Sequence, residues 1–366
     1  MPVNSASGSF RLLFLFDVCE EIVLDEVRKI LGIRSEGREP TFRRPTPEYV
    51  RFQNPPVMER LEPCLHDSGE RLEGRLKYYD YGVVSAEYEL TFELTWKDLI
   101  RFSSRWITDR DMEQRAADTV ARHLERVRPA VIKRYDRQLS EDYYIIQLNG
   151  ACHEDGSPVS ALELIKDHGD QIAMLIRAEA TDLSKDEKAE ILQSTVSYYP
   201  NDLVVLGWTA ALVYDTPEGA VPSMQLLEYA NSQLLEFRHY DELLTTVLNG
   251  VYRSLDKGTG FLARWRMARE AEQLNTIRLD VRELTERVDN SIKFVSDMFS
   301  ARLYRLAAAK VGVPDYRLLV DEKLDTAGEL YRFLMDEFYQ ARAFVLESMV
   351  LVILLIELIF LFRGKG

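Results

Sequence analysis

The clearest hydrophobic pattern in the chain is a run of twenty mostly apolar residues, 343–362, with the sequence AFVLESMVLVILLIELIFLF. As a helix this run is about 30 Å long, which matches the hydrocarbon core of a bilayer. Its 15 Leu, Ile, Val and Phe residues favour insertion by about 6 kcal/mol, and Glu357 opposes insertion by at most about 3 kcal/mol. Arg342 precedes the run, and Arg363 and Lys365 follow it. The pattern predicts one transmembrane helix over 343–362, and the alternative is a buried core helix of a soluble protein.

Two acidic residues, Glu347 and Glu357, interrupt this apolar run. Together with Val350 and Leu354 they follow a 3–4–3 spacing, which places both carboxylates on one broad side of a helix. A charge at this depth faces protein or water in preference to lipid. We therefore expect these residues to form a helix–helix contact in an oligomer or to line an ion path, and we prefer the contact because one span cannot enclose a path alone. The alternative is a protonated Glu357 that lipid tolerates.

Helical spacing continues upstream of the apolar run. Residues 315–362 contain no proline and one glycine, Gly328, so they are predicted to form one helix about 70 Å long that includes the span. Residues 222–257 also have helical spacing, and Gly258 and Gly260 mark a turn after them. Apolar residues from Leu274 to Leu306 recur with a mean spacing of about 3.6, which indicates a further amphipathic helix. Residues 219–342 are thus predicted to form a coiled-coil-like stalk of long antiparallel helices.

The first part of the chain, 1–216, has the mixed pattern of an α/β domain. Strand patterns lie at 10–16, 71–79, 83–92, 143–148 and 203–214, and helical spacing lies at 20–31, 96–107, 112–137 and 184–193. Pro129 predicts a kink or a break within 112–137. The two runs around Asp80–Tyr81–Gly82 predict a hairpin, and the apolar run 203–214 predicts the central buried strand. The expected fold class is α+β: this domain, the long helices, then the membrane helix.

Residues 34–63 are rich in arginine and proline and predict an extended loop. The basic residues of this loop are Arg34, Arg38, Arg43, Arg44 and Arg51, and Phe42, Tyr49 and Phe52 are interleaved with them. Aromatic and basic side chains in alternation can stack on bases or bind an anionic partner. We interpret it as a possible partner-binding loop. The alternative is a solvated loop that its aromatic residues hold against the domain.

The charge balance argues against nucleic acid as a partner. The formal net charge is −14 and the pI is about 5.0, so a general affinity for polyanions has no electrostatic basis. The first 30 residues lack a signal peptide, and the three widely spaced cysteines fit a reducing compartment. We expect a single-pass protein of a bacterial-type inner membrane, with the bulk of the chain in the cytoplasm.

Catalytic and metal-binding motifs are sparse. Two pairs, Cys64 with His66 and Cys152 with His153, lack the spacing of structural zinc sites. The chain has no G-x-S-x-G, no phosphate-binding loop and no dinucleotide fingerprint, and its five histidines define no pair. We therefore expect no catalytic residues, no metal and no cofactor.

Three short motifs resemble the "required for meiotic nuclear division" (YagE-like) family. They are YDYGVV at 79–84; Lys323–Leu324 followed by Glu329–Leu330–Tyr331; and an LE-x6-IL-x2-E pattern from Leu346 to Glu357. The resemblance spans roughly residues 70–362, and Ser348 stands where that family often has an aromatic residue, as in a distant member. It implies an α/β domain, a helical C-terminal half and a membrane helix. Eukaryotic relatives of this family lie in the mitochondrial inner membrane and support organelle translation.

These patterns favour a membrane-anchored, non-enzymatic scaffold or assembly protein that forms a homo-oligomer through its stalk and anchor and binds a further, unidentified protein. One alternative is a membrane-tethered enzyme with its site in the α/β domain. Another is an ion channel or transporter subunit; magnesium channels with long stalk helices have two spans and a Gly-Met-Asn signature, and neither occurs here.

Overall fold

The computed structural model describes residues 5–33, 55–151, 157–256, 269, 271–272, 274–282 and 298–364. The chain forms two compact units. Unit 1 comprises Met1–Phe237 and Asp289–Pro314, and unit 2 comprises Arg238–Val288 and Asp315–Gly366.

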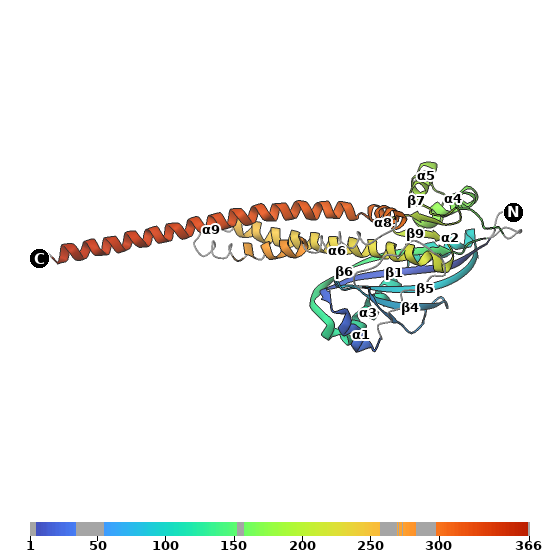
Figure 1. The fold of residues 1–366 in the computed structure, drawn as a ribbon, viewed down its shortest axis with the longest axis horizontal. Helices are drawn as coiled ribbons and strands as arrows, with labels where there is room; N and C mark the ends of the chain where they lie inside the picture. Colours follow the sequence, from blue (N-terminus) through green and yellow to red (C-terminus); the bar gives the residue numbers. More distant parts are fainter. Residues whose placement is uncertain are drawn as a thin grey trace. The chain divides into compact units, whose positions relative to one another are not determined.

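Unit 1 is built on a nine-stranded mixed sheet with the strand order β2-β4-β5-β1-β6-β9-β8-β7, and β3 pairs with β4 (Figure 1). The strands are β1 Ser5–Ile22, β2 Val57–Arg60, β3 Cys64–Leu65, β4 Arg71–Tyr78, β5 Val83–Thr95, β6 Val131–Leu148, β7 Thr195–Val196, β8 Leu203–Leu206 and β9 Ala210–Tyr214. Among the described strands only β6 and β9 pair in parallel. A largely antiparallel sheet followed by long helices confirms the α+β class.

The two faces of this sheet differ in chemistry because side chains alternate along each strand. On β1, Phe10, Leu12 and Phe14 join one large apolar core with residues of α2 Trp96–Ile107, α3 Arg110–Arg126 and α4 Ala161–Arg177. The opposite face is also buried but is rich in polar groups. It contacts the first half of α6 Pro217–Asp256.

Most of the predicted elements of unit 1 are present. The hairpin, α2 and α5 Lys185–Gln193 are confirmed, and the side chain of Ser184 caps α5 by accepting from the backbone N–H of Glu187 at 3.2 Å. Helix α1 Leu24–Leu31 ends at Gly32 as predicted, with φ of 65°. It begins four residues later than predicted because β1 continues to Ile22.

Three expectations were wrong in part. The helix predicted over 112–137, with a kink or a break after Pro129, is broken there: α3 ends at Arg126, a short 3-10 turn, Arg128–Ala130, follows, and residues 131–137 belong to β6. The central strand predicted over 203–214 is two short strands, β8 and β9, joined by a tight turn in which Gly207 N–H donates to Ala210 O at 2.9 Å. They lie toward one edge of the sheet. Residues 57–60, which lie within the loop predicted over 34–63, form β2.

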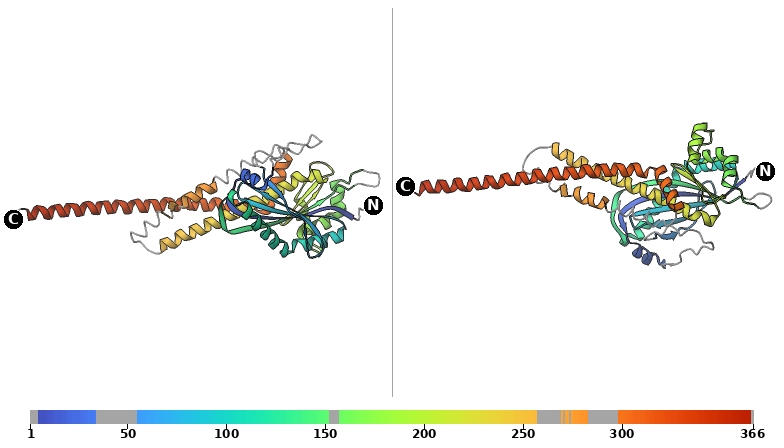
Figure 2. Two further views of the ribbon diagram at one scale, coloured as in Figure 1. Left: turned by 90° about the horizontal axis from the view of Figure 1, so that it is seen from below. Right: turned by 45° about the horizontal axis from the view of Figure 1, so that its top comes forward.

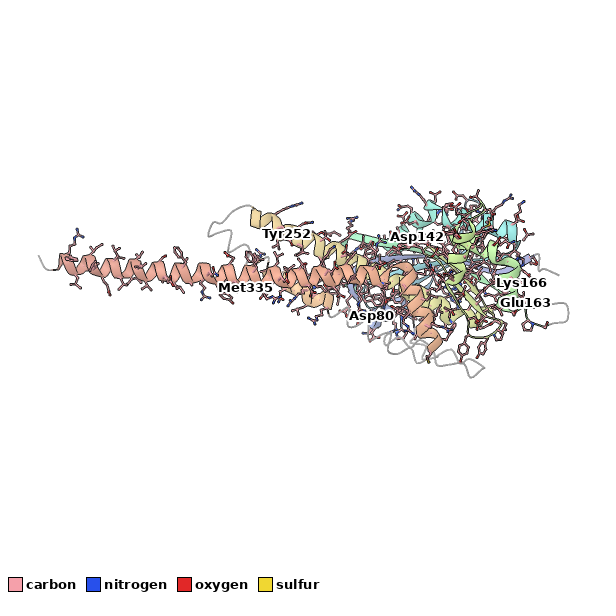
Figure 3. All side chains as sticks on the ribbon, turned by 90° about the horizontal axis from the view of Figure 1, so that it is seen from above. Asp80, Asp142, Glu163, Lys166, Tyr252 and Met335 are labelled. Atoms are coloured by element: carbon pink, nitrogen blue, oxygen red, sulfur yellow. The ribbon has the colours of Figure 1, made fainter. Side chains whose placement is uncertain are left out.

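Unit 2 is helical. The second half of α6, the helical residues 274–282 and the part of α9 Val313–Arg363 beyond Pro314 contribute to it. Two small clusters join them: Val251 with Ala271 and Leu334, and Leu248 with Leu274 and Ala327. Figure 3 labels Tyr252 on α6 and Met335 on α9. The predicted helix over 274–306 includes residues 283–297, which lie outside the described part, so its continuity and the coiled-coil-like stalk stay predictions.

Helix α9 is continuous over 51 residues, as Figure 2 shows from two further directions. This confirms the uninterrupted helix expected from residue 315 onward. It begins directly after α8 Met298–Val311, and Gly312 with φ of 92° separates the two. Gly328 of α9 lies against the guanidinium of Arg278: a Cβ there would lie 2.8 Å from its Nη1.

Candidate functional site

The apolar segment of α9 is the most conspicuous surface of unit 2. An 18-residue window of this helix has a mean hydropathy of 2.7, and none of it is buried. Figure 3 shows its side chains projecting on all sides. In the described part of the chain this is the one helix long and apolar enough to cross a membrane.

Glu347 and Glu357 both lie on this segment and are exposed in the single chain. The described residues provide neither carboxylate with a hydrogen bond or ion pair. Their role in a helix–helix contact therefore stays a prediction. The basic residues of the proposed partner-binding loop, Arg34, Arg38, Arg43, Arg44 and Arg51, lie outside the described residues, and so does that hypothesis.

The possible zinc ligands are not brought together in what the structure describes. Cys64 is a free thiol, and Cys152 and His153 are outside the described residues. Among described residues no group of three or more His, Cys, Asp or Glu side chains has the arrangement of a metal site.

A buried network of charges lies on the polar face of the sheet in unit 1. Its centre is Glu87 on β5, whose side chain is 2% exposed. Arg11 Nη1 lies 2.5 Å from Glu87 Oε1, Arg75 Nη2 lies 3.2 Å from the same oxygen, and Lys77 Nζ lies 2.9 Å from Oε2. Lys77 also forms an ion pair with Glu228 of α6, which is equally buried.

The two arginines extend this network toward solvent. Arg11 and Arg75 both contact Glu89, at 2.9 Å and 2.7 Å. Together with Lys77, Glu87 and Glu228 they make a set of three cations and three carboxylates. Because the charges balance and each carboxylate has a cationic partner, the set is suited to holding α6 on the sheet.

The pKa values in this network reflect the competition between burial and pairing. Burial alone raises the pKa of the Glu87 carboxyl, but Lys77, Arg11 and Arg75 outweigh it and lower that pKa to about 2. Burial alone lowers the pKa of Lys77, and the carboxylates of Glu228 and Glu87 raise it above its ordinary value. Both side chains therefore remain charged at neutral pH.

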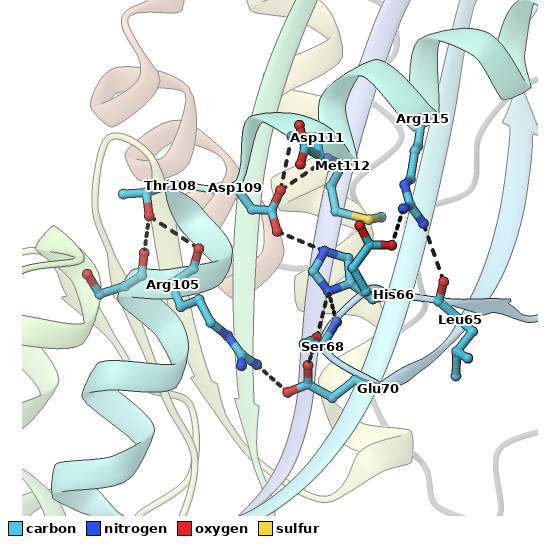
Figure 4. A network of polar contacts seen from close by, with 12 residues as sticks. Leu65, His66, Ser68, Glu70, Arg105, Thr108, Asp109, Asp111, Met112 and Arg115 are labelled. Carbon is cyan, nitrogen blue, oxygen red and sulfur yellow. Dashed lines mark hydrogen bonds and ion pairs between the residues drawn. The ribbon is translucent and has the colours of Figure 1, made fainter.

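A second polar network lies on the opposite side of the sheet, where the β3–β4 turn meets the α2–α3 connection (Figure 4). His66 Nε2 lies 3.0 Å from Asp109 Oδ2, and His66 Nδ1 lies 2.6 Å from the hydroxyl of Ser68. The other oxygen of Asp109 caps α3 by accepting from the backbone N–H groups of Asp111 and Met112. The ring of His66 also packs on Trp106, with centroids 4.7 Å apart.

The contact order Ser68–His66–Asp109 is that of a catalytic triad, although sequence analysis expected no such pair. Its hydrogen bonds indicate a structural role instead. The backbone N–H of Ser68 donates to His66 Nδ1 at 3.2 Å, so Nε2 carries the proton that Asp109 accepts. The single proton of the Ser68 hydroxyl is donated to Glu70, and the Gly69 N–H donates to His66 O. Both backbone donors next to the serine are thus occupied within the turn, whereas acyl transfer requires donors free to bind an oxyanion.

The same turn is bound to the helices by ion pairs. Glu70 pairs with Arg105, and Asp67 Oδ1 lies 2.7 Å from Arg115. We name the contacts of His66, Ser68, Glu70, Arg105 and Asp109 the turn staple. No sequence pattern indicates the turn staple, because its parts are separated by about 40 residues and follow no common spacing.

The comparisons with known proteins find one family model. The model described as "Uncharacterized protein MJ0711, N-terminal domain" matches residues 7–220, the span that holds the sheet and its covering helices. The chain is also similar to "Uncharacterized protein MJ0711" of Methanocaldococcus jannaschii, with 20% identity over 225 residues, 62% of this chain and 68% of that protein. No solved structure matches. Neither match carries the name of the "required for meiotic nuclear division" family, so that resemblance stays a prediction.

Proposed function

We propose, from the premise that this chain belongs to the family described as "Uncharacterized protein MJ0711, N-terminal domain", that it is a membrane-anchored, non-enzymatic scaffold or assembly protein. Unit 1 faces the cytoplasm and binds a protein partner, and α9 holds the chain in the bilayer. Copies of the chain associate through the membrane segment.

The observation that carries this proposal is the exposure of the apolar segment of α9. The hydropathic window has no buried residue, and apolar surface of this extent is unstable in water. Burial in hydrocarbon removes the segment from water, and an α-helix satisfies its own backbone hydrogen bonds there.

The non-enzymatic part of the proposal is supported by how the polar groups of unit 1 are engaged. Glu87 is surrounded by three cations, and both ring nitrogens of His66 are occupied. Side chains held in this way stabilise the fold and are poorly placed to exchange protons with a substrate.

Carbonate extraction of the full chain from membranes tests the anchor. We expect the wild-type protein to stay in the membrane pellet at high pH and the variant Leu351→Lys/Leu355→Lys to shift to the soluble fraction, since each lysine in the span costs about 3 kcal/mol. The matched control is Leu65→Lys/Leu162→Lys, at two residues of unit 1 that are 67% and 80% exposed. Release of the wild-type protein at high pH would refute the anchor.

A catalytic role of the Ser68–His66–Asp109 contact is tested in a separate experiment. Substitution of Ser68 by alanine removes the hydroxyl of the triad-like contact, and the scaffold proposal expects partner capture and membrane retention to be unchanged. Loss of a hydrolytic activity toward a small ester in this variant, with activity present in the wild type, would favour the membrane-tethered enzyme instead.

A further inference from the structure

The part of α9 in unit 2 that precedes the apolar segment has two different faces. Its inner face is buried, with Val320, Ala327 and Leu334 at intervals of seven residues. Ala327 and Leu334 pack in the clusters with α6 and residues 271–274. Lys323 adds polar contacts between α9 and α6, because its ammonium lies 2.5 Å from Asp241 Oδ1 and 2.6 Å from the Thr245 hydroxyl.

The outer face of the same helix carries acidic residues at a strict seven-residue interval. They are Asp315, Glu322, Glu329 and Asp336, and all four are exposed. No described residue forms an ion pair with any of the four. Because residues seven apart lie almost in line on a helix, these carboxylates form one row.

Large apolar side chains flank this row at both of its ends. Leu318 and Leu319 are 60% and 43% exposed, and Phe333 and Tyr339 are 52% and 56% exposed. Leu319 and Phe333 are two heptads apart, on one side of the acidic row, and Leu318 and Tyr339 are three heptads apart on the other. We name this combination of four acidic and four apolar residues the outer seam of α9.

We propose that the outer seam of α9 is a docking surface for a basic amphipathic helix of a partner protein, in which Lys or Arg recurs every seven residues between apolar anchors. The acidic row would pair with the Lys or Arg side chains of the partner helix, and the two apolar pairs would pack against its apolar anchors at either end of the contact. Residues 313–342 contain seven acidic and four basic side chains. Lys323 is engaged by Asp241, and Arg317 lies 3.9 Å from Asp321.

A second copy of this chain does not fit the seam. In a parallel pair, which a shared membrane anchor imposes, each carboxylate of the row meets its own counterpart, and like charges at facing positions are unfavourable. Self-association is therefore confined to the apolar segment, and the seam is left for a different, basic partner.

The probe for this surface is a synthetic 28-residue helical peptide with Lys every seven residues and Leu at the intervening core positions. Its counterpart with Glu in place of Lys is the charge control. Binding of the fluorescent peptide to the full chain in non-ionic detergent is followed by anisotropy at low and at high salt. We expect the Lys peptide to bind at low salt and to lose affinity at least tenfold as salt rises, and the Glu peptide not to bind.

Variants of the chain test whether the Lys peptide binds at the outer seam of α9. Glu322→Lys/Glu329→Lys/Asp336→Lys should weaken the Lys peptide by more than tenfold, and Phe333→Ala should weaken it severalfold without a change in charge. The matched control is Glu62→Lys/Glu93→Lys/Asp186→Lys, which reverses three exposed carboxylates of unit 1 and changes the net charge equally. An equal loss in both triple variants would show attraction to the acidic protein as a whole and would overturn the proposal. So would a wild-type oligomer that dissociates in the seam variant, because the seam would then bind a second copy.

Discussion

Lys77 on β4 forms a buried ion pair with Glu228, which follows it by 151 positions along the chain and lies on α6. Lys77 also contacts Glu87 on the neighbouring strand at 2.9 Å. One ammonium thus joins the polar face of the sheet to the helix that covers it. The pairing explains how this face can be buried although it carries charges, since each buried carboxylate has a cation beside it.

Loss of Lys77 should destabilise unit 1 strongly. Lys77→Met keeps the length and apolar stem of the side chain but leaves Glu228 buried without its cation, a change that costs about 3–5 kcal/mol. Urea unfolding in detergent, followed by tryptophan fluorescence, measures the loss. The control is Lys29→Met, because Lys29 pairs with Glu26 on the surface, where solvent screens the charges and the pair contributes little to stability. Equal stabilities of the two variants would contradict the role of the buried pair.

Glu87 should make the stability of unit 1 depend on pH in the acid range. Its pKa is lowered in the folded state to about 2, so the folded state binds its proton less readily than the unfolded state. The stabilisation is therefore complete above the unfolded pKa, near 4.5, and is lost as pH falls toward 2. A shift of this size corresponds to about 3 kcal/mol.

The variant Glu87→Gln tests this linkage. It should be less stable than the wild type at pH 6, and the difference in unfolding free energy should narrow as pH falls from 4.5 to 2.5. Glu93→Gln, at an exposed residue of the same strand, serves as the control, and its difference from the wild type should stay small throughout. If the difference in unfolding free energy between Glu87→Gln and the wild type does not change with pH, Glu87 is not the titrating group.

The elements that the sequence predicted correctly are those with local signals. The apolar run 10–16 predicted a strand, which lies within β1, and the helical spacing over 96–107 predicted α2, where the Thr95 hydroxyl accepts from the Asp98 N–H. The β8–β9 turn was missed because both flanking strands are buried on both faces, so the apolar run is interrupted only by Gly207, Trp208 and Thr209. The first half of β6 was missed because its residues are mostly charged and exposed, and charges at 133–137 continue the helical spacing of α3.

The candidate site was less predictable than the fold. The apolar segment and its two glutamates are contiguous in the chain, and the sequence alone placed them. The network around Glu87 had a weaker signal: Arg75 and Lys77 alternate on one strand and Glu87 and Glu89 on the next, each at a spacing of two. This spacing places all four on one face of a hairpin, but Glu228 on α6 joins them through tertiary packing that no local pattern indicates.

Gly82 should be the least replaceable glycine of the hairpin between β4 and β5. Its φ is 92°, and a Cβ at this position would lie 1.8 Å from the carbonyl oxygen of Cys19. Gly82→Ala should therefore cost more than about 2 kcal/mol, since both backbone strain and a backbone clash contribute. Gly150→Ala is the matched control, because a Cβ there meets no atom within 4 Å. Similar thermal midpoints for the two variants would show that the hairpin relaxes freely.

The turn staple should stabilise the β3–β4 turn without any catalytic contribution. Asp109→Ala removes both the acceptor for His66 and the N-cap of α3, so we expect a loss of about 1–2 kcal/mol and faster amide exchange at residues 64–70. Ser68→Ala removes only an exposed hydroxyl and should change stability by less than about 0.5 kcal/mol. Hydrogen exchange with mass spectrometry distinguishes the two. The staple interpretation fails if the turn exchanges at the wild-type rate in Asp109→Ala.

Glu357 should be required for self-association but not for membrane insertion. Its replacement by leucine removes a carboxyl group from the apolar run 343–362. The fraction of Glu357→Leu that stays in the membrane pellet should therefore be at least as large as that of the wild type. If the carboxyl forms a contact between copies, the variant should lose cross-linked dimer. Leu355→Ala changes a side chain about 160° away around the helix and should leave the cross-linking pattern unchanged. A dimer yield that Glu357→Leu does not alter would remove the case for a polar contact between anchors and would leave this glutamate as a protonated residue that lipid tolerates.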